Sequence, residues 1–138
     1  MGDWYVIASI PTALERDAHN AIERYQLDPD GTIRTTFTFR DGSFDGEQKT
    51  YHPRGFVQAR DSNAVWGMQF VWPIKADYRI VYLDPGYAYT AIGRNRRDYV
   101  WIMARAPTMP DAVYETILHQ LGEQGYDTSL IRKVPQRW

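Results

Sequence analysis

The chain has 138 residues, no cysteine, a formal net charge of −1, 43% hydrophobic residues and 14% aromatic residues. This length suits one domain, residues 1–138, with one core, and the near-neutral charge argues against a dedicated nucleic-acid binder, which is normally strongly basic. The absence of cysteine excludes disulfides, thiolate metal sites and cysteine nucleophiles, but it leaves the cellular compartment open.

Strand-like segments separated by turn residues run along most of the chain. Glycine, proline, aspartate and asparagine mark the turns, because glycine supplies a positive φ and proline presets φ. The segments predicted as strands are 3–10, 20–28, 32–40, 47–58, 63–71, 77–84, 87–93 and 98–105. Eight strands with mostly hairpin-length links predict an all-β fold, an antiparallel up-and-down barrel or a sandwich. The longer link 11–19 is expected to carry a helical turn and act as a lid.

One helix is predicted after the strands. Thr108-Met-Pro-Asp111 has the form of a capping box with proline in the first turn. Gly125 is expected to end the helix. An apolar stripe at helical spacing lies between them, formed by Val113, Ile117, Leu118 and Leu121. We therefore expect an external helix packed on the sheet, followed by a last short strand over 130–134.

Side-chain alternation along the strands predicts which residues point into the barrel. An eight-stranded barrel is just wide enough to be filled by side chains or to hold one small ligand, and the sequence is compatible with both arrangements. A concave apolar pocket with a few polar groups is the usual small-molecule site. The residues expected to line it are Phe37, Phe39, Tyr51, Trp66, Met68, Phe70, Tyr82, Tyr89, Trp101 and Met103.

The second strand places a carboxylate on the inward face. Ala21, Glu23, Tyr25 and Leu27 share that face by alternation. Glu23 and the tyrosine hydroxyls, Tyr25 included, would orient or reject polar ligands. A buried glutamate without a partner tends to take up a proton.

The two ends of the strand series are predicted to meet. Trp4 begins the first strand and Arg105 ends the eighth, and these strands are neighbours in a closed up-and-down barrel. A guanidinium stacked on an indole contributes about 0.5–2 kcal/mol. The turn from Asp84 to Tyr87 falls at the same end, so three segments are expected to form a plug there.

These three regions resemble the signature motifs of the lipocalins: Gly2-x-Trp4-Tyr5, Leu83-Asp84-x-x-Tyr87 and Arg105. The chain is most similar to the bacterial lipocalins and the apolipoprotein D-like proteins. There the first strand reads G-x-W-Y-x-I-A and a later stretch reads D-Y-x-W-I-x-x-R-x-P-T, matched by 2–8 and 98–108. The resemblance implies an eight-stranded barrel with a C-terminal external helix that carries a fatty acid or lysophospholipid, with Trp4 as a structural plug.

Location is implied by the resemblance alone. Members of this branch usually carry a leader with a lipidated cysteine, which is not expected in this sequence. A periplasmic or outer-membrane location, and membrane association through such a leader or lipid anchor, are therefore expectations from the family. No stretch approaches the roughly 20 apolar residues of a membrane-spanning helix, and no signal peptide is expected. A cytoplasmic location stays an alternative. The chain is expected to be a monomer or a dimer.

Basic residues are predicted at the open end of the barrel. Arg94 and Arg96 belong to the hairpin 93–98, and Arg16 and Lys75 come from two other loops at that end. We hypothesise that these cations favour a carboxylate or phosphate headgroup at the mouth, the alternative being a solvated loop. At the same end, the stretch from Trp72 to Lys75 is bulkier than the family pattern.

Catalysis is not expected. His19, His52 and His119 are scattered, and no spacing such as H-x-x-x-H indicates a metal site. No cofactor is predicted, and a haem ligated by His19 is less favoured still. The partner expected is a small lipophilic ligand. An enzyme that uses the barrel as its substrate pocket and a filled barrel that acts as an interaction domain are the alternatives.

Overall fold

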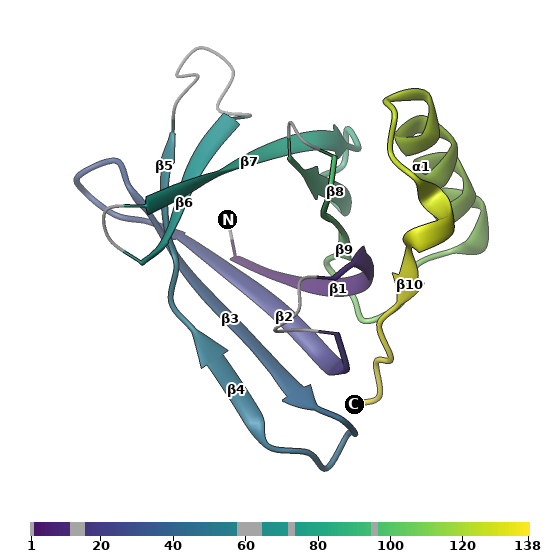
Figure 1. Ribbon diagram of the computed structural model, residues 1–138, viewed down its shortest axis with the longest axis horizontal. Helices are drawn as coiled ribbons and strands as arrows, with labels where there is room; N and C mark the ends of the chain where they lie inside the picture. The colour runs from purple at the N-terminus through teal and green to yellow at the C-terminus, as the bar shows by residue number, and fades with distance from the viewer. Residues whose placement is uncertain (1, 12–15, 58–64, 72–73, 95–96) are drawn as a thin grey trace.

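The computed structural model describes residues 2–11, 16–57, 65–71, 74–94 and 97–138, with the backbone alone described at 57, 65–71 and 74–78 (Figure 1). Ten strands and an external helix make up most of it. The strands are β1 Gly2–Ile10, β2 Ala18–Leu27, β3 Ile33–Asp41, β4 Gln48–Tyr51, β5 Arg54–Val57, β6 Val65–Val71, β7 Ile74–Leu83, β8 Tyr89–Gly93, β9 Val100–Ala104 and β10 Arg132–Lys133. The helices are α1 Asp111–Glu123 and the 3₁₀ turn η2 Thr128–Leu130.

The strands pair antiparallel in chain order, and β1 pairs with both β2 and β9. Hydrogen-bonded neighbours therefore run around a closed ring, which confirms the predicted up-and-down barrel. The predicted fourth strand is split at His52-Pro53 into β4 and β5, which both pair with β3. Proline has no N–H for the ladder, and its carbonyl accepts from the Thr35 N–H at 3.2 Å. The predicted lid falls partly on 12–15, outside the described residues.

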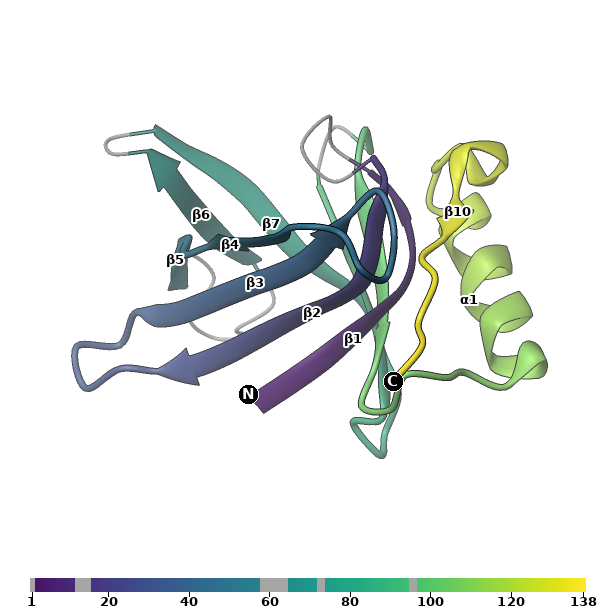
Figure 2. The same ribbon diagram turned by 90° about the horizontal axis from the view of Figure 1, so that it is seen from below.

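Two clusters of buried side chains lie on opposite faces of the sheet. The interior cluster consists of Trp4, Val6, Ala18, Ala21, Tyr25, Ile33, Phe37, Phe39, Ile92, Trp101 and Met103. The outer cluster lies between α1 and the outside of β1, β8 and β9, and consists of Ala8, Ile10, Ala91, Val100, Ile102, Ile117, Leu121 and Tyr126. Figure 2 shows α1 standing on one side of the barrel. Since both faces of β9 are covered, all five of its residues are buried.

Helix α1 is amphipathic as predicted, but it begins differently. Ile117 and Leu121 are buried against the sheet. Gly125 ends the helix at φ +98°, and the Tyr126 N–H reaches back to the Leu121 carbonyl at 3.0 Å. The predicted capping box is wrong: Pro110 is the N-cap residue and no side chain caps the helix. Proline has no side-chain acceptor, and Thr108 lies too far before the first turn to supply one.

The C-terminal strap, residues 131–138, fills a gap between β1 and β2. Direct pairing of these strands ends at Tyr5 opposite Ile22, and both strands are irregular beyond it. Strand β10 pairs with Ala8 and Ser9 of β1, which confirms the predicted last strand. The Gln136 amide then donates to the Val6 carbonyl at 2.8 Å and the Ala21 carbonyl at 3.1 Å. The strap therefore satisfies backbone groups that the divergence would leave unpaired.

Candidate functional site: the barrel interior

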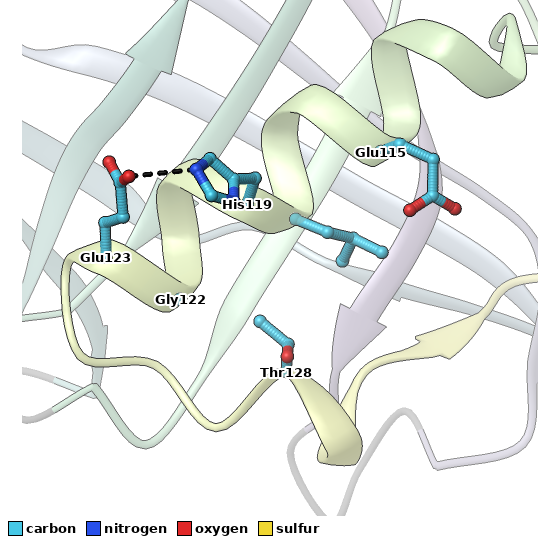
Figure 3. Close-up of a pocket in the computed structure, with 6 residues that line it drawn as sticks. Glu115, His119, Gly122, Glu123 and Thr128 are labelled. Atoms are coloured by element: carbon cyan, nitrogen blue, oxygen red, sulfur yellow. Dashed lines mark ion pairs between the residues drawn. The ribbon is translucent and has the colours of Figure 1, made fainter.

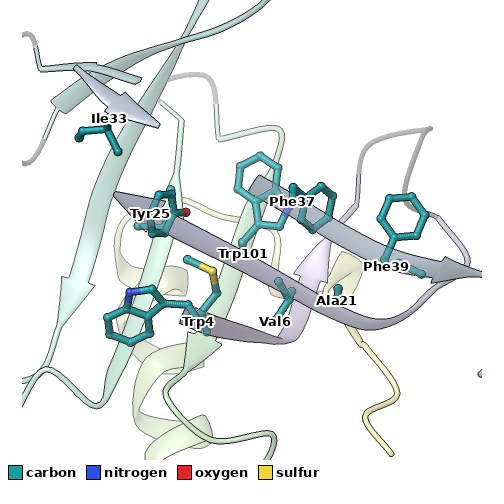
Figure 4. Close-up of a cluster of buried hydrophobic side chains, with 11 residues drawn as sticks. Trp4, Val6, Ala21, Tyr25, Ile33, Phe37, Phe39 and Trp101 are labelled. Atoms are coloured by element: carbon teal, nitrogen blue, oxygen red, sulfur yellow. The ribbon is translucent and has the colours of Figure 1, made fainter. Parts of the chain in front are cut away.

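Aromatic side chains of β1, β2, β3 and β9 gather inside the barrel (Figure 4). Phe37, Phe39 and Trp101 are buried, and Tyr51 packs against them half-buried. The ring centroids of Phe37 and Phe39 are 5.3 Å apart, and those of Phe39 and Tyr51 are 6.2 Å apart and stacked. Both spacings lie in the range at which aromatic pairs attract. The interior therefore presents large, rigid apolar surfaces.

A carboxylate lies among these rings. Glu23 is 7% exposed and accepts a hydrogen bond from the Tyr25 hydroxyl, and Tyr25 itself is buried. Glu23 lies opposite Trp4 on β1 and Phe37 on β3 in the strand register, both of which belong to the interior cluster. The neighbouring Arg24 is exposed instead and pairs with Asp3 at 2.6 Å. This alternation confirms the inward placement predicted for Glu23.

The closed end of the barrel is a plug built on Trp4 and Arg105. The Arg105 guanidinium carbon lies 3.8 Å from the centre of the Trp4 ring, as the sequence predicts. Its Nη1 donates to the Asp3 carbonyl at 3.0 Å. Gly2 has φ +83°, and a Cβ there would lie 3.2 Å from Nη1 of Arg105. Glycine thus suits both the backbone and the close approach of the guanidinium.

The turn after β7 completes the plug. One oxygen of Asp84 accepts from the N–H groups of Ala88 and Tyr89, both at 2.7 Å, and the other accepts from Gly86. These bonds, that from Tyr89 first, hold the pKa of Asp84 below its usual value. Tyr87 is exposed and offers its carbonyl, not its ring, to Arg105 at 3.4 Å. The predicted convergence of three segments is confirmed.

Two tyrosines predicted to line the interior lie elsewhere. Tyr82 and Tyr89 both pack against the outer cluster. The register of β7 with β8 shifts between Ile80 and Tyr82, so that Ile80 faces Ile92 inside and Tyr82 faces Ala91 outside. A β-bulge inserts one residue and reverses the alternation beyond it. Tyr89 shares the outer face of β8 with Ala91, so its inward placement is also wrong.

The structure describes the side chains of only some of the other residues predicted to line the interior. Met103 is fully buried in the interior cluster. Trp66, Met68 and Phe70 belong to β6, but their side chains lie outside the description. Interior residues that the sequence analysis missed are Val6, Ala18, Ile33 and Ile92. Ile33 shares the face of β3 with Phe37 and Phe39 by alternation, and this was the signal that could have added it.

The predicted mouth cations do not form one observed group. Lys75 is wrong as a loop residue, because it belongs to β7 opposite Gln69. Arg96 lies outside the described residues. Arg94 pairs with Asp98 at 3.4 Å and lies over the Tyr99 ring. Arg16 lines a hollow of about 180 Å³ whose other basic side chains include Arg132 and Lys133 of the strap.

A second hollow, of about 530 Å³, is lined by side chains of α1 and by Thr128 of η2 (Figure 3). His119 and Glu123 form an ion pair at 2.9 Å along it, and both side chains are exposed. Among the residues that the structure describes, no three histidines or acids gather to hold a metal, and no helix is long and apolar enough to cross a membrane. The hollow therefore presents an ordinary solvated helix face.

Comparison with known proteins agrees with this geometry. The family model of the lipocalin-like domain matches residues 1–136. The chain is 32% identical to temperature-induced lipocalin-1 of Arabidopsis thaliana, covering 99% of this chain and 76% of that protein. It is 27% identical to outer membrane lipoprotein Blc of Escherichia coli, covering 94% and 72%.

Solved structures show the same fold. A lobster apocrustacyanin matches with a TM-score of 0.76 at 14% identity, covering 99% of this chain and 77% of that one. The cockroach allergen Per a 4 matches with a TM-score of 0.73 at 19% identity, covering 99% and 85%. With the family model matching nearly the whole chain, this protein belongs to the lipocalin family.

Proposed function

We propose that this lipocalin binds and carries a lipophilic ligand of the fatty acid or lysophospholipid class inside its barrel. Lipocalins are a family of proteins that bind small hydrophobic molecules, and they are generally not enzymes. The observation that supports the proposal is the interior itself, where buried aromatic rings surround a buried Glu23 and Tyr25. An apolar interior with few polar groups is the usual form of a small-molecule site.

The energetics favour an acyl chain as the ligand. Each buried CH₂ group contributes about 0.8 kcal/mol, so half a fatty-acid chain already gives useful affinity. Phe37, Phe39 and Trp101 would lie along such a chain, with Met103 as an adaptable neighbour. We propose the same role for Trp66, Met68 and Phe70 of β6. The similarity to outer membrane lipoprotein Blc supports a place in the bacterial envelope for this carrier.

The headgroup is proposed to lie at the open end. Because the strands are antiparallel, the links after β1, β3, β6 and β8 lead from the end of the barrel opposite the Trp4 plug. Arg16 lies between β1 and β2, and Lys75 lies at the start of β7, both toward this end. A carboxylate or phosphate would be attracted there. The double variant Arg16→Gln with Lys75→Gln should weaken binding of anionic lipids more than of neutral ones. Equal weakening of both lipid classes would contradict this headgroup role.

Native mass spectrometry of the purified chain with oleate and with a lysophospholipid tests the carrier proposal. We expect a one-to-one adduct that survives mild activation and is lost in Trp101→Glu, which places a charge inside the barrel. Trp138→Glu is the matched control, because Trp138 is 68% exposed on the strap. Absence of an adduct with either lipid would overturn the proposal and favour a filled barrel.

A further inference from the structure

We infer that the hollow between the C-terminal strap and the start of β2 binds a phosphate group through the guanidinium groups of Arg16 and Arg132. We call it the strap hollow. The inference goes beyond the proposed function, because the strap hollow lies beside the strap and its occupation needs no ligand inside the barrel. The sequence analysis gave Arg132 no role, since only the folded chain brings it to the same hollow as Arg16.

The strap hollow has the size of a small polar group. Its volume is about 180 Å³, and one water takes up about 30 Å³ of the liquid, so a phosphate group fits but a whole lipid does not. Three segments line it: the end of β1 with Ser9, residues 16–19, and residues 132–135 of the strap. A ligand in the strap hollow therefore bonds segments that meet only in the folded chain.

Strand register separates the two basic residues of β10. Arg132 lies opposite Ser9, and Lys133 lies opposite Ala8. Directly opposed residues share one face of a sheet, with Cβ atoms about 4.5–5.5 Å apart. Ala8 belongs to the outer cluster, and the Lys133 ammonium accordingly lies 4.6 Å from the centre of the Tyr114 ring on α1, which the strap faces (Figure 2). Arg132 shares the other face with Ser9.

Ser9 supplies a buried hydroxyl to the strap hollow. Its opposed residue on β9 is Trp101 of the interior cluster, so Ser9 faces the inner side of the sheet. It is 3% exposed and lines the strap hollow. Within the described part of the chain, its hydroxyl bonds no other group. Buried hydroxyls are normally hydrogen-bonded, and a phosphate oxygen in the strap hollow would accept from this one.

The charges around the strap hollow favour an anion. Arg16 and Arg132 are exposed, and neither is ion-paired among the residues that the structure describes. Asp17 is the acid in the lining, and its carbonyl accepts from Nδ1 of His19 at 2.9 Å. Two guanidinium groups thus oppose one carboxylate, with the Lys133 ammonium near by. The planar fork of a guanidinium matches phosphate oxygens.

A phosphate suits this arrangement better than a carboxylate does. Its oxygens can meet both guanidinium groups and the Ser9 hydroxyl at once, whereas the two oxygens of a carboxylate leave one of these donors unmet. A bound phosphate would also join the strap to the segment before β2, so we expect it to hold the strap in place.

Titration of the ¹⁵N-labelled chain with inorganic phosphate tests the inference, with sodium chloride keeping the ionic strength constant. We expect saturable changes of amide shifts at Ser9, at residues 17–19 and at residues 132–134. Charge-assisted hydrogen bonds from two guanidinium groups correspond to a Kd in the millimolar range or tighter. This measurement localises the site in the wild-type chain, without any variant.

Variants of the two arginines test their roles separately. Arg16→Gln and Arg132→Gln should each weaken phosphate binding about tenfold or more, the range for a hydrogen bond to a charged group. Arg137→Gln is the matched control, because it makes the same change of charge on the strap but lies over the Phe44 ring, outside the lining of the strap hollow. It should leave phosphate affinity unchanged.

A phosphate group can come from solution or from a lipid headgroup, and oleoyl lysophosphatidate with oleate separates these sources. If the lipid headgroup occupies the site, lysophosphatidate shifts the same amides, and Arg132→Gln weakens its binding but not that of oleate. If free phosphate is the ligand, these amides respond to inorganic phosphate and not to lysophosphatidate. Both results support the phosphate site and differ only in its source.

Other outcomes overturn the inference without touching the proposed function, or the reverse. Amides around the strap hollow that do not respond saturably to phosphate, or an equal loss of affinity in Arg137→Gln and Arg132→Gln, would overturn the phosphate site while oleate binding stands. Phosphate binding at the strap hollow in a chain that binds neither oleate nor a lysophospholipid would support the site and overturn the lipid carrier.

Discussion

Arg105 joins three segments at the closed end through contacts made by one side chain. Its guanidinium covers the Trp4 ring and donates to the carbonyls of Asp3 and Tyr87. Arg105→Ala should therefore lower the free energy of unfolding by about 1–2 kcal/mol, from the lost cation–π contact and the unpaired Asp3 carbonyl. Urea denaturation of the two proteins measures the difference.

Arg24 provides the control for the Arg105 prediction. Arg24 also bonds Asp3, but through an ion pair in which both side chains are largely exposed. Exposed ion pairs contribute little because water screens them, so Arg24→Ala should change the unfolding free energy much less than Arg105→Ala. Equal losses in the two variants would show that the plug depends on surface charge and not on the Trp4 stack.

Asp84 makes the stability of the plug depend on pH. Its hydrogen bonds from backbone N–H groups lower its pKa in the folded chain relative to the unfolded value near 3.8. Its contribution is therefore fully present above about pH 4 and is lost as pH falls through the lower folded pKa. Asp84→Asn should be less stable than the wild type at neutral pH, and this difference should shrink in acid. Urea midpoints measured from pH 7 down to pH 2.5 test this, and a constant difference would contradict it.

At the scale of elements, one side-chain amide of the strap bonds both strands that the strap bridges. Gln136 donates to carbonyls of both β1 and β2 at the place where their own pairing has ended. Gln136→Glu keeps the size of the side chain but removes its N–H donors and sets an acid against two carbonyls. We expect a loss of about 1–3 kcal/mol, the cost of leaving such groups unsatisfied.

Exchange of backbone amides localises this effect. The N–H groups of Asn20 and Val134 bond across the strap, to the carbonyls of Pro135 and Ile7. Both should exchange faster in Gln136→Glu. Gln26→Glu, at an exposed position of β2, is the matched control and should alter neither stability nor exchange at these sites. Unchanged exchange in Gln136→Glu would show that the other bonds of the strap hold it without the Gln136 amide.

Elements that follow a regular period were predictable from the sequence, and those that break it were not. Phe37, Phe39, Trp101 and Glu23 face inward because undisturbed strands alternate with period two. Tyr82 was misplaced because a bulge reverses this alternation, and nothing in the local pattern marks the bulge. The bridging of β1 and β2 by the strap was not predicted, because its partners are backbone groups at the irregular points of these strands. Only the register of the folded strands reveals these points.

At the scale of the whole molecule, the outer packing cluster and the proposed binding surface lie on different faces of the same strands. The outer cluster packs α1 on β1, β8 and β9, whereas the interior cluster faces the proposed ligand. Leu121 is fully buried in the outer cluster, so Leu121→Ala should cost about 2–5 kcal/mol of unfolding free energy. Because its side chain is on the far side of the sheet from the ligand, oleate affinity should not change.

Phe37→Ala is the matching substitution on the interior face of the barrel, and it should affect ligand binding. It also removes a buried side chain, but this one lies in the interior cluster, where the ligand is proposed to bind. We expect oleate affinity to fall by roughly tenfold to a hundredfold, because burying an aromatic side chain is worth about 1.5–3 kcal/mol. The oleate-induced rise in Tm, which follows ligand concentration over Kd, should then shrink in Phe37→Ala and persist in Leu121→Ala. If folded Leu121→Ala lost oleate binding as well, the two faces of β1 and β9 would be coupled, and α1 would belong to the binding machinery.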